Sequence, residues 1–322
     1  MMKGAVNRLE HRGASGRTTS RKAVITKITS IIWSVVRAVL LIGLAYVILY
    51  PVAYSLSVSI REIDDMMDPT VIWLPKNLTL DNIRFVLGST DFVGAFFRSL
   101  LLSLSCSVLQ MFSCAVTGYG FARFRFRGRN LLFFAALLTV VVPPQIISMP
   151  LYIQYSQFTM ATGIPTLNTI LPTSISALFA QGLKAGLFIY LFRQSYKGMP
   201  LELEDAAYLD GCGPVKAFFR VMLPNSGPIM LVTFILTFVW YWNDYINVSL
   251  FFNDAKPLAV LLEGLGSLLL TMRTPDGLAF GEIEKSVYTT TFCLLFILPP
   301  IILYAFLQKR FTESLMNSSI VG

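Results

Sequence analysis

Few residues in this chain of 322 are suited to catalysis, and their types argue against an enzyme. The single histidine, His11, is close to the N-terminus, and the cysteines Cys106, Cys114, Cys212 and Cys293 stand singly. Without a C-x-x-C pair or a second histidine, the sequence offers neither a zinc site nor a His-based catalytic triad. We therefore predict no catalytic residue, no metal site and no bound cofactor on this chain.

The residues that do suggest chemistry are polar side chains inside long apolar stretches. Asp244 is the only charged residue in the stretch 226–252. A charge in a stretch that crosses a membrane is costly and usually functional, which makes Asp244 a candidate for a substrate path. Its neighbours would suit a sugar, through stacking and hydrogen bonds, and are candidates for the same path: Trp240, Tyr241, Trp242, Asn243 and Tyr245. An aromatic belt at a membrane interface is the alternative.

Lys184 is likewise the only charged residue in the stretch 164–192. Counted back from Arg193 along a helix, it would lie roughly 13 Å inside. There it could attract an acidic saccharide such as a uronate, or it could pair with a polar group on a neighbouring helix or extend to the interface. Gln145, which follows two prolines, is a further candidate for the path.

The composition indicates that these apolar stretches lie in a membrane. Hydrophobic residues make up 55% of the chain and charged residues 14%, with a mean hydropathy of +0.65. A soluble domain averages about 25% charged residues, so we predict an integral membrane protein. The net charge of +8 does not call for nucleic acid, because basic residues beside membrane spans set the topology and contact lipid headgroups.

A transmembrane helix needs about 20 mostly apolar residues, and six segments qualify. We expect an all-α membrane fold with the spans 31–60, 92–122, 131–155, 164–192, 226–252 and 286–307. The pairs Pro143-Pro144 and Pro299-Pro300 are expected to break the third and sixth of these helices, or only to kink them.

Lys and Arg gather on one side of this arrangement, in the segments 1–27, 123–129, 193–220 and 309–310. Because cytoplasmic loops carry the excess of Lys and Arg, both termini are predicted to be cytoplasmic. The expected division is a basic cytoplasmic tail (1–27), a first span with an outer loop (28–93), a transmembrane domain (94–308) and a cytoplasmic C-terminal tail (309–322).

The cytoplasmic loop 194–225, between the fourth and fifth spans, has a distinctive centre. Its sequence predicts a short helix, because acidic residues gather in the first turn and Gly211 is suited to a left-handed end. At about ten residues this helix cannot cross a bilayer. The small pair Ala206-Ala207 would let another protein approach this helix closely. Because the helix is held between two spans, it could act as a lever that passes movement of that protein to the spans.

The spacing in this loop is specific. Asp205-Ala206-Ala207, three residues, Gly211, nine residues and Val221-Met222-Leu223-Pro224 follow one another. This order resembles the EAA loop of binding-protein-dependent ABC importer permeases, with Asp in place of Glu and Val in place of Ile. Further along, Trp242-Asn243-Asp244 and Gln308-Lys309-Arg310-Phe311 are similar to the smaller permease of maltose-type carbohydrate importers.

The resemblance implies a division of labour among several chains. Such a permease, in the bacterial cell (inner) membrane, pairs with a second homologous permease and receives a carbohydrate from an extracellular or periplasmic solute-binding protein. Two cytoplasmic ATPase subunits, which carry ATP and Mg, bind the loop. The residues implied in coupling to the ATPases are Glu204, Asp205, Ala206, Ala207, Gly211, Leu223 and Pro224.

Other classes of transporter remain as alternatives. The sequence has no G-x-x-x-x-G-K-[S/T] phosphate loop, which agrees with an energy source on another polypeptide. An importer permease for a different solute class would carry the same loop. A proton- or sodium-coupled secondary transporter would need buried acidic or His relays and an internal repeat, and only Asp244 fits that requirement.

Overall fold

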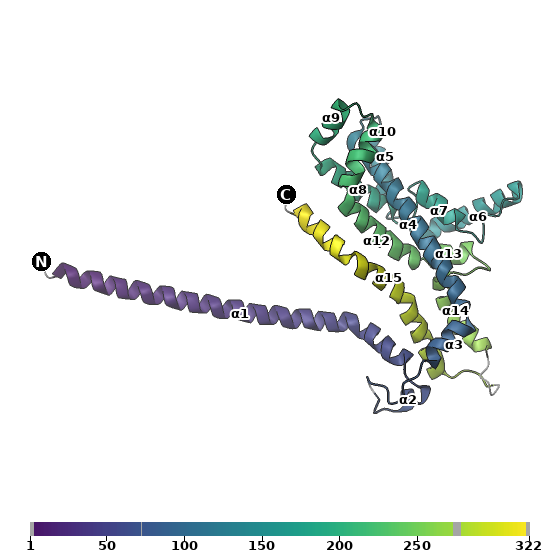
Figure 1. Ribbon diagram of the computed structural model, residues 1–322, viewed down its shortest axis with the longest axis horizontal. Coiled ribbons are helices and arrows are strands. Elements are labelled where there is room, and N and C mark those ends of the chain that lie inside the picture. Colours follow the sequence, from purple (N-terminus) through teal and green to yellow (C-terminus); the bar gives the residue numbers. More distant parts are fainter. Residues whose placement is uncertain (1–2, 72, 273–277, 320–322) are drawn as a thin grey trace. The chain divides into compact units, whose positions relative to one another are not determined.

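Helices make up the regular structure of the chain, as expected for the all-α class (Figure 1). This computed structural model describes the backbone of residues 3–71, 73–272 and 278–319, and the side chains of residues 26–71, 73–272 and 278–309. Within these ranges no β-strand is present. Contacts divide the chain into two units, one up to Ser57 and one from Val58 onward.

The first unit consists of helix α1 (Lys3–Ser59), whose last residues belong to the second unit. Its part Thr26–Ser59 is long and apolar enough to cross a membrane, in agreement with the first expected span. The helix also continues back through the basic tail, where no proline interrupts it before Pro51.

The second unit contains the remaining helices. They are α2 (Ile63–Met67), α3 (Asp81–Ser89), α4 (Phe92–Arg123), α5 (Arg129–Leu138), α6 (Pro144–Thr162), α7 (Leu171–Leu178), α8 (Ala185–Gly198), α9 (Glu202–Leu209), α10 (Pro214–Ala217), the π-helix η1 (Phe218–Met222), α11 (Leu223–Asn225), α12 (Gly227–Trp242), α13 (Ile246–Phe251), α14 (Leu258–Thr271) and α15 (Glu282–Ser319).

Helix α4 is the centre of the second unit, where it packs against α8, α12 and α7. Its buried residues recur every three or four positions, which places them on one stripe of the helix. Most of them are small: Ala95, Ser99, Ser103, Cys106, Ser107, Cys114, Ala115 and Gly118. Because small residues let helix backbones approach closely in a membrane, this stripe lets α8, α12 and α7 pack tightly against α4.

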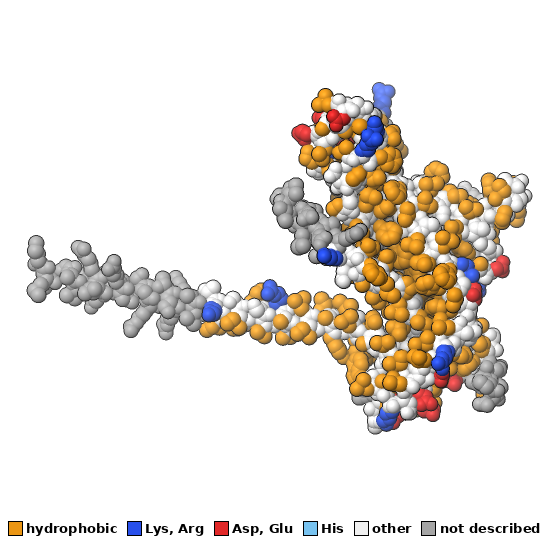
Figure 2. Space-filling model, viewed as in Figure 1, with side chains coloured by type: hydrophobic (Ala, Val, Ile, Leu, Met, Phe, Trp, Pro, Cys, Tyr) orange, Lys and Arg blue, Asp and Glu red, His pale blue; other side chains and the backbone are white. Residues whose placement is uncertain are grey.

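The surface of the second unit suits lipid. Hydrophobic side chains cover much of its visible face between the end that carries α9 and α10 and the opposite end near α2, where charged side chains gather (Figure 2). Large apolar residues on the outside of the helices are exposed, among them Leu101, Leu131 and Ile302. Soluble proteins rarely expose so continuous an apolar surface.

Some of the expected spans are single long helices in the structure, and others are divided into two helices. Among the described residues, α4 and the part Glu282–Lys309 of α15 can cross a membrane alone, as can Thr26–Ser59. The bent pair Pro214–Asn225 and Gly227–Trp242, with an angle of 77°, is a further candidate. The third and fourth expected spans are each two helices, α5 with α6 and α7 with α8, so the count of six stays a prediction.

The two proline pairs behave differently. Pro143 precedes α6 and Pro144 is its first residue, which confirms the predicted break. At the other pair the expected break is absent, because α15 runs through Pro299 and Pro300 without interruption. A transmembrane helix tolerates proline where neighbouring helices hold its course, and α12 and α14 both pack against α15.

The contact between α4 and α8 generates a test of this packing. A Cβ atom on Gly118 would lie 2.5 Å from the Cβ of Phe192 and 3.0 Å from the backbone nitrogen of Arg193. We expect Gly118→Ala to lower the free energy of unfolding by about 1–3 kcal/mol, because the helices must separate. Thermal unfolding in detergent measures this effect.

Gly120→Ala is the matched control on the same helix, because its Cβ would meet nothing within 4 Å. This variant should keep or slightly raise the unfolding temperature, since alanine favours a helix. Equal unfolding temperatures for the two variants would show that α4 and α8 do not need this close approach.

Candidate functional site

The loop between α8 and α12 folds as expected around a short helix. Helix α9 ends where Gly211 adopts a left-handed conformation with φ of 76°. The backbone N–H of Cys212 then donates to the carbonyl of Ala207, and that of Gly211 to the carbonyl of Tyr208, at 3.0 Å each. This pair of bonds is a Schellman end, which needs a residue that tolerates positive φ.

Glu204 turns inward from α9 and holds the helix to the end of α4. Its Oε2 lies 2.8 Å from Nε of Arg123, and its Oε1 accepts a hydrogen bond of 2.5 Å from the hydroxyl of Tyr119. Arg123 also donates from Nη2 to the carbonyl of Met199 at 2.9 Å. Because Glu204 is only 4% exposed, it anchors the loop and has no free surface for a partner.

The outward face of α9 combines the acidic residues Glu202 and Asp205 with apolar side chains. Asp205 and Ala206 are exposed, and Leu209 is 89% exposed. Ala207 is buried at 5% exposure, so the expected surface of two alanines is wrong in part. Glu204 and Ala207, three positions apart, lie on the buried side of α9, so Ala206 alone of the pair faces outward.

The last expected coupling residues lie where the loop joins α12. Leu223 is buried, whereas Pro224 is exposed at the start of α11. The preceding η1 packs against α9, and the chain bends by 77° between α11 and α12. A π-helix and a proline are both recognised causes of a sharp change in helix direction.

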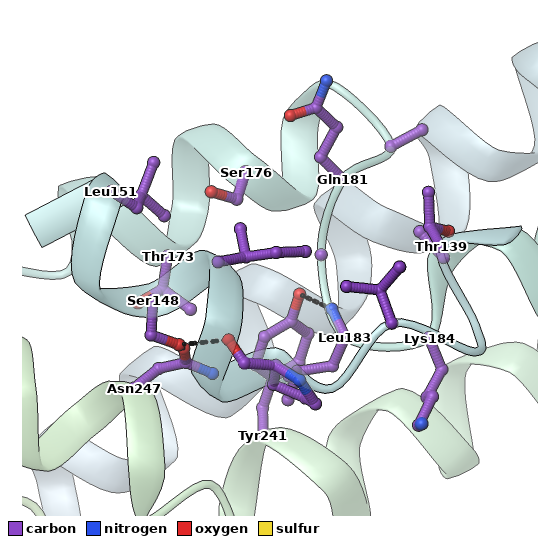
Figure 3. Close-up of a pocket in the computed structure, with 16 residues that line it drawn as sticks. Thr139, Ser148, Leu151, Thr173, Ser176, Gln181, Leu183, Lys184, Tyr241 and Asn247 are labelled. Carbon is purple, nitrogen blue, oxygen red and sulfur yellow. Dashed lines mark hydrogen bonds between the residues drawn. The ribbon is translucent and has the colours of Figure 1, made fainter. Parts of the chain in front are cut away.

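A cavity of about 370 Å³ lies where two helix breaks meet (Figure 3). One break separates α5 from α6, and the other separates α7 from α8. The lining includes Ser148, Thr173, Ser176, Lys184, Tyr241 and Asn247. A cavity of this size, with apolar walls and a few polar groups, has the character of a small-molecule site.

Tyr241 is the one member of the expected aromatic set that lines this cavity. Its hydroxyl donates to Oε1 of Gln110 at 2.5 Å and accepts from the backbone N–H of Leu183 at 3.3 Å. Gln110 in turn donates from Nε2 to the carbonyl of Leu183 at 2.7 Å. These bonds fix the loop after α7 against α4 and α12.

Asp244 is connected to the cavity without lining it. Its carboxylate accepts hydrogen bonds from the backbone N–H of Asn247 at 3.1 Å and from Nδ2 of Asn247 at 2.9 Å. The Oδ1 of Asn247 accepts a hydrogen bond of 2.6 Å from Ser148, on α6. Asp244 therefore orients an amide that faces the cavity.

The other expected path residues do not come together. Trp242 is 1% exposed in the core and donates from Nε1 to the carbonyl of Phe296 at 3.0 Å. Trp240 packs in a second cluster, with its ring 5.3 Å from that of Phe188. The remaining members, Asn243, Tyr245 and Gln145, are exposed and do not line the cavity.

Lys184 lines the cavity but not in the way expected. It is exposed, with φ of 54°, and it immediately precedes α8. The expected continuous span 164–192 is wrong here, because the segment between Leu178 and Ala185 is not helical. The count back from Arg193 runs along α8, so the depth of Lys184 stays a prediction. The sequence gives little warning of this break, since the segment contains no proline.

Sequence reasoning missed the residues that hold these sites together. Gln110 is a fully buried amide within an apolar span, and a criterion that included uncharged polar residues would have identified it. Arg123 was counted only as a topology signal. Among the described residues no group of three or more His, Cys, Asp or Glu could hold a metal ion.

The chain is similar to known transport proteins. The family described as "Binding-protein-dependent transport system inner membrane component" matches residues 115–316. The "Arabinooligosaccharides transport system permease protein AraQ" of Halalkalibacterium halodurans is 29% identical over 284 residues, which cover 87% of this chain and 93% of that protein. The protein of the same name from Bacillus subtilis is 32% identical over 254 residues, which cover 77% of this chain and 81% of the relative.

A solved structure shares the fold. It is the crystal structure of a bacterial ABC transporter involved in the import of the acidic polysaccharide alginate, and one of its chains matches with a TM-score of 0.69 at 20% identity. The match covers 87% of this chain and 96% of that one. The family match extends over more than half of this chain and includes the whole loop with α9. The chain therefore belongs to the family of binding-protein-dependent transport system inner membrane components.

Proposed function

We propose that this chain is the permease subunit of an ATP-driven importer and forms, with a second homologous permease, the pore for an oligosaccharide. The observation that carries the proposal is helix α9, which a buried ion pair fixes to α4 and which exposes Asp205 and Leu209. In a chain of this family, such a helix is suited to bind an ATPase. The names of the two AraQ relatives support an oligosaccharide as the substrate.

The energy comes from partner chains. Two cytoplasmic ATPase subunits bind ATP and Mg and contact the outward face of α9, with Asp205 facing basic groups and Ala206 permitting close approach. A solute-binding protein delivers the saccharide on the opposite side. This division agrees with the lack of a phosphate loop in the sequence.

The proposed topology has six spans with both termini in the cytoplasm. In addition to α1, α4 and α15, the pairs α5–α6, α7–α8 and α12–α13 each form one broken span. The basic segments support this orientation, because the Lys- and Arg-rich runs then lie on the same side as α9.

Two connections carry movement from α9 into the membrane. Glu204 links α9 to the end of α4 through Arg123 and Tyr119, and η1 links α9 to the bend before α12. Both α4 and α12 also hold the cavity, through Gln110 and Tyr241. We place the substrate path at this cavity, with Tyr241 and Asn247 among its polar groups.

Reversal of the charge at Asp205 tests the docking surface. Asp205→Lys should leave the chain in the membrane but lower the amount of ATPase that co-purifies with it, because the residue is exposed and its charge is inverted. Asp64→Lys makes the same change at an exposed position of α2 and should retain the ATPase. Equal retention by both variants would rule out Asp205 as a contact.

The buried ion pair of Glu204 and Arg123 gives a second test. Glu204→Gln leaves Arg123 without its counter-charge, and we expect the free energy of unfolding to fall by about 3–5 kcal/mol. Transport per ATP hydrolysed should fall as well, because α9 is no longer fixed to α4.

A double variant separates these two effects. Arg123→Met with Glu204→Gln removes the unpaired charge and should recover most of the thermal stability. If it also recovers full transport per ATP, the ion pair is not part of the connection between α9 and α4.

The proposed function itself is tested by purification of the chain from its native membrane in mild detergent, with mass spectrometry of the proteins that accompany it. We expect an ATPase, a second permease and, after cross-linking, a solute-binding protein. Deletion of the chain should abolish uptake of the oligosaccharide which that binding protein captures. A chain recovered alone, with no ATPase even after cross-linking, would point instead to a secondary transporter.

A further inference from the structure

The cavity contains a polar group that the protein itself does not satisfy. Thr173, on α7, is only 6% exposed, and its hydroxyl has no hydrogen-bond partner among the described residues. Thr173 lines the cavity, and Figure 3 shows it on the same side as Ser148. Buried hydroxyls nearly always have a partner, so this one is open to a hydrogen bond with a ligand in the cavity.

Two helices begin at the cavity. Pro144 and Ser148 lie in the first turn and a half of α6, and Lys184 and Ala185 stand at the start of α8; all four line the cavity. The N-terminal end of a helix carries a partial positive charge and favours an anion. Broken membrane helices whose N-terminal ends meet at one site are suited to an acidic group.

Lys184 adds a full positive charge to these two helix ends. It is the only charged residue among the 16 that line the cavity. Its Nζ donates a hydrogen bond of 3.4 Å to the carbonyl of Val140, which does not line the cavity, so the ammonium lies at the edge of the cavity and must turn inward to meet an anion (Figure 3). Asp244 does not offset it within the lining, because its carboxylate lies behind Asn247, which supplies both of its hydrogen bonds.

The backbone around Lys184 is strained. Three non-glycine residues in the described chain have positive φ, and two of them, Ala180 and Lys184, flank this cavity with φ of 55° and 54°. Such a conformation costs about 1–3 kcal/mol per residue and concentrates at functional sites. These two left-handed residues interrupt the helix between α7 and α8 and place Lys184 beside the cavity.

We infer that this cavity takes a saccharide that carries a carboxylate, a uronate, and that Lys184 selects it from neutral saccharides. A single lysine matches a group with one negative charge, whereas a phosphate with nearly two would call for a cluster of basic residues. Thr173, Ser176 and Asn247 face the saccharide hydroxyls. This inference rests on the proposed function, because it concerns the substrate of the same importer.

The test uses the complete importer in proteoliposomes with two probes, trigalacturonate and its methyl ester. They differ in charge while their hydroxyl pattern is the same. Lys184→Met should lower the uptake of trigalacturonate at low concentration by about tenfold to a hundredfold, as expected for the loss of a charged hydrogen bond, and leave the ester unaffected. Lys184→Arg should retain preference for the acid.

Two further variants separate binding from structure. Lys256→Met removes an exposed lysine outside the cavity and the loop with α9, and should leave both probes unaffected. Thr173→Val should slow uptake of both probes without lowering the unfolding temperature, because the hydroxyl has no partner to lose. Normal transport by Thr173→Val would overturn the role assigned to this hydroxyl.

Failure of the inference is distinct from failure of the proposed function. If the wild-type complex imports the ester but not the acid, or if Lys184→Met slows both equally, the selection of a uronate is wrong while the importer stands. If the complex retains its ATPase but imports neither probe, the uronate inference is again overturned. If no ATPase joins the chain, the proposed function fails as well.

Discussion

The close approach of α4 and α8 is the contact on which the rest of the second unit depends. At Gly118 there is no space for a Cβ atom, because the Cβ of Phe192 and the backbone of Arg193 are already there. Lipid tails are as apolar as leucine, so membrane helices associate mainly through such tight packing and not through the hydrophobic effect. The small residues of α4 meet this requirement along the whole helix and bring α7, α8 and α12 against it.

One consequence is that α4 carries both of the sites described above. Gln110 holds Tyr241 and the loop before α8 at the cavity, and Arg123 holds Glu204 at the loop with α9. These residues are separated by about 20 Å along one helix. A rigid element that is anchored at both places can transmit a displacement of α9 to the cavity without a change in its own fold. The bend before α12 gives a second connection from the same loop.

A second consequence concerns the interrupted helices. A break in a membrane helix leaves backbone groups without partners, and this is tolerated only where protein or a polar cavity surrounds them. Here the two breaks, at Pro143 and before Lys184, meet at a cavity that polar side chains line. The first is enforced by two prolines, whereas the second is held by Tyr241 and Gln110, whose hydrogen bonds replace part of the helical pattern around Leu183.

The amino-acid sequence alone determined the membrane class, the all-α fold and the loop with α9, because these depend on composition, local periodicity and the glycine at position 211. It could not determine which side of α9 faces inward, since the partner of Glu204 is Arg123, far away in the chain. Nor could it separate Tyr241 at the cavity from Trp242 in the core, because only packed neighbours decide which face of α12 is buried. Local signals gave these elements, whereas the break before Lys184 and the positions of polar groups within a site follow from contacts between distant segments.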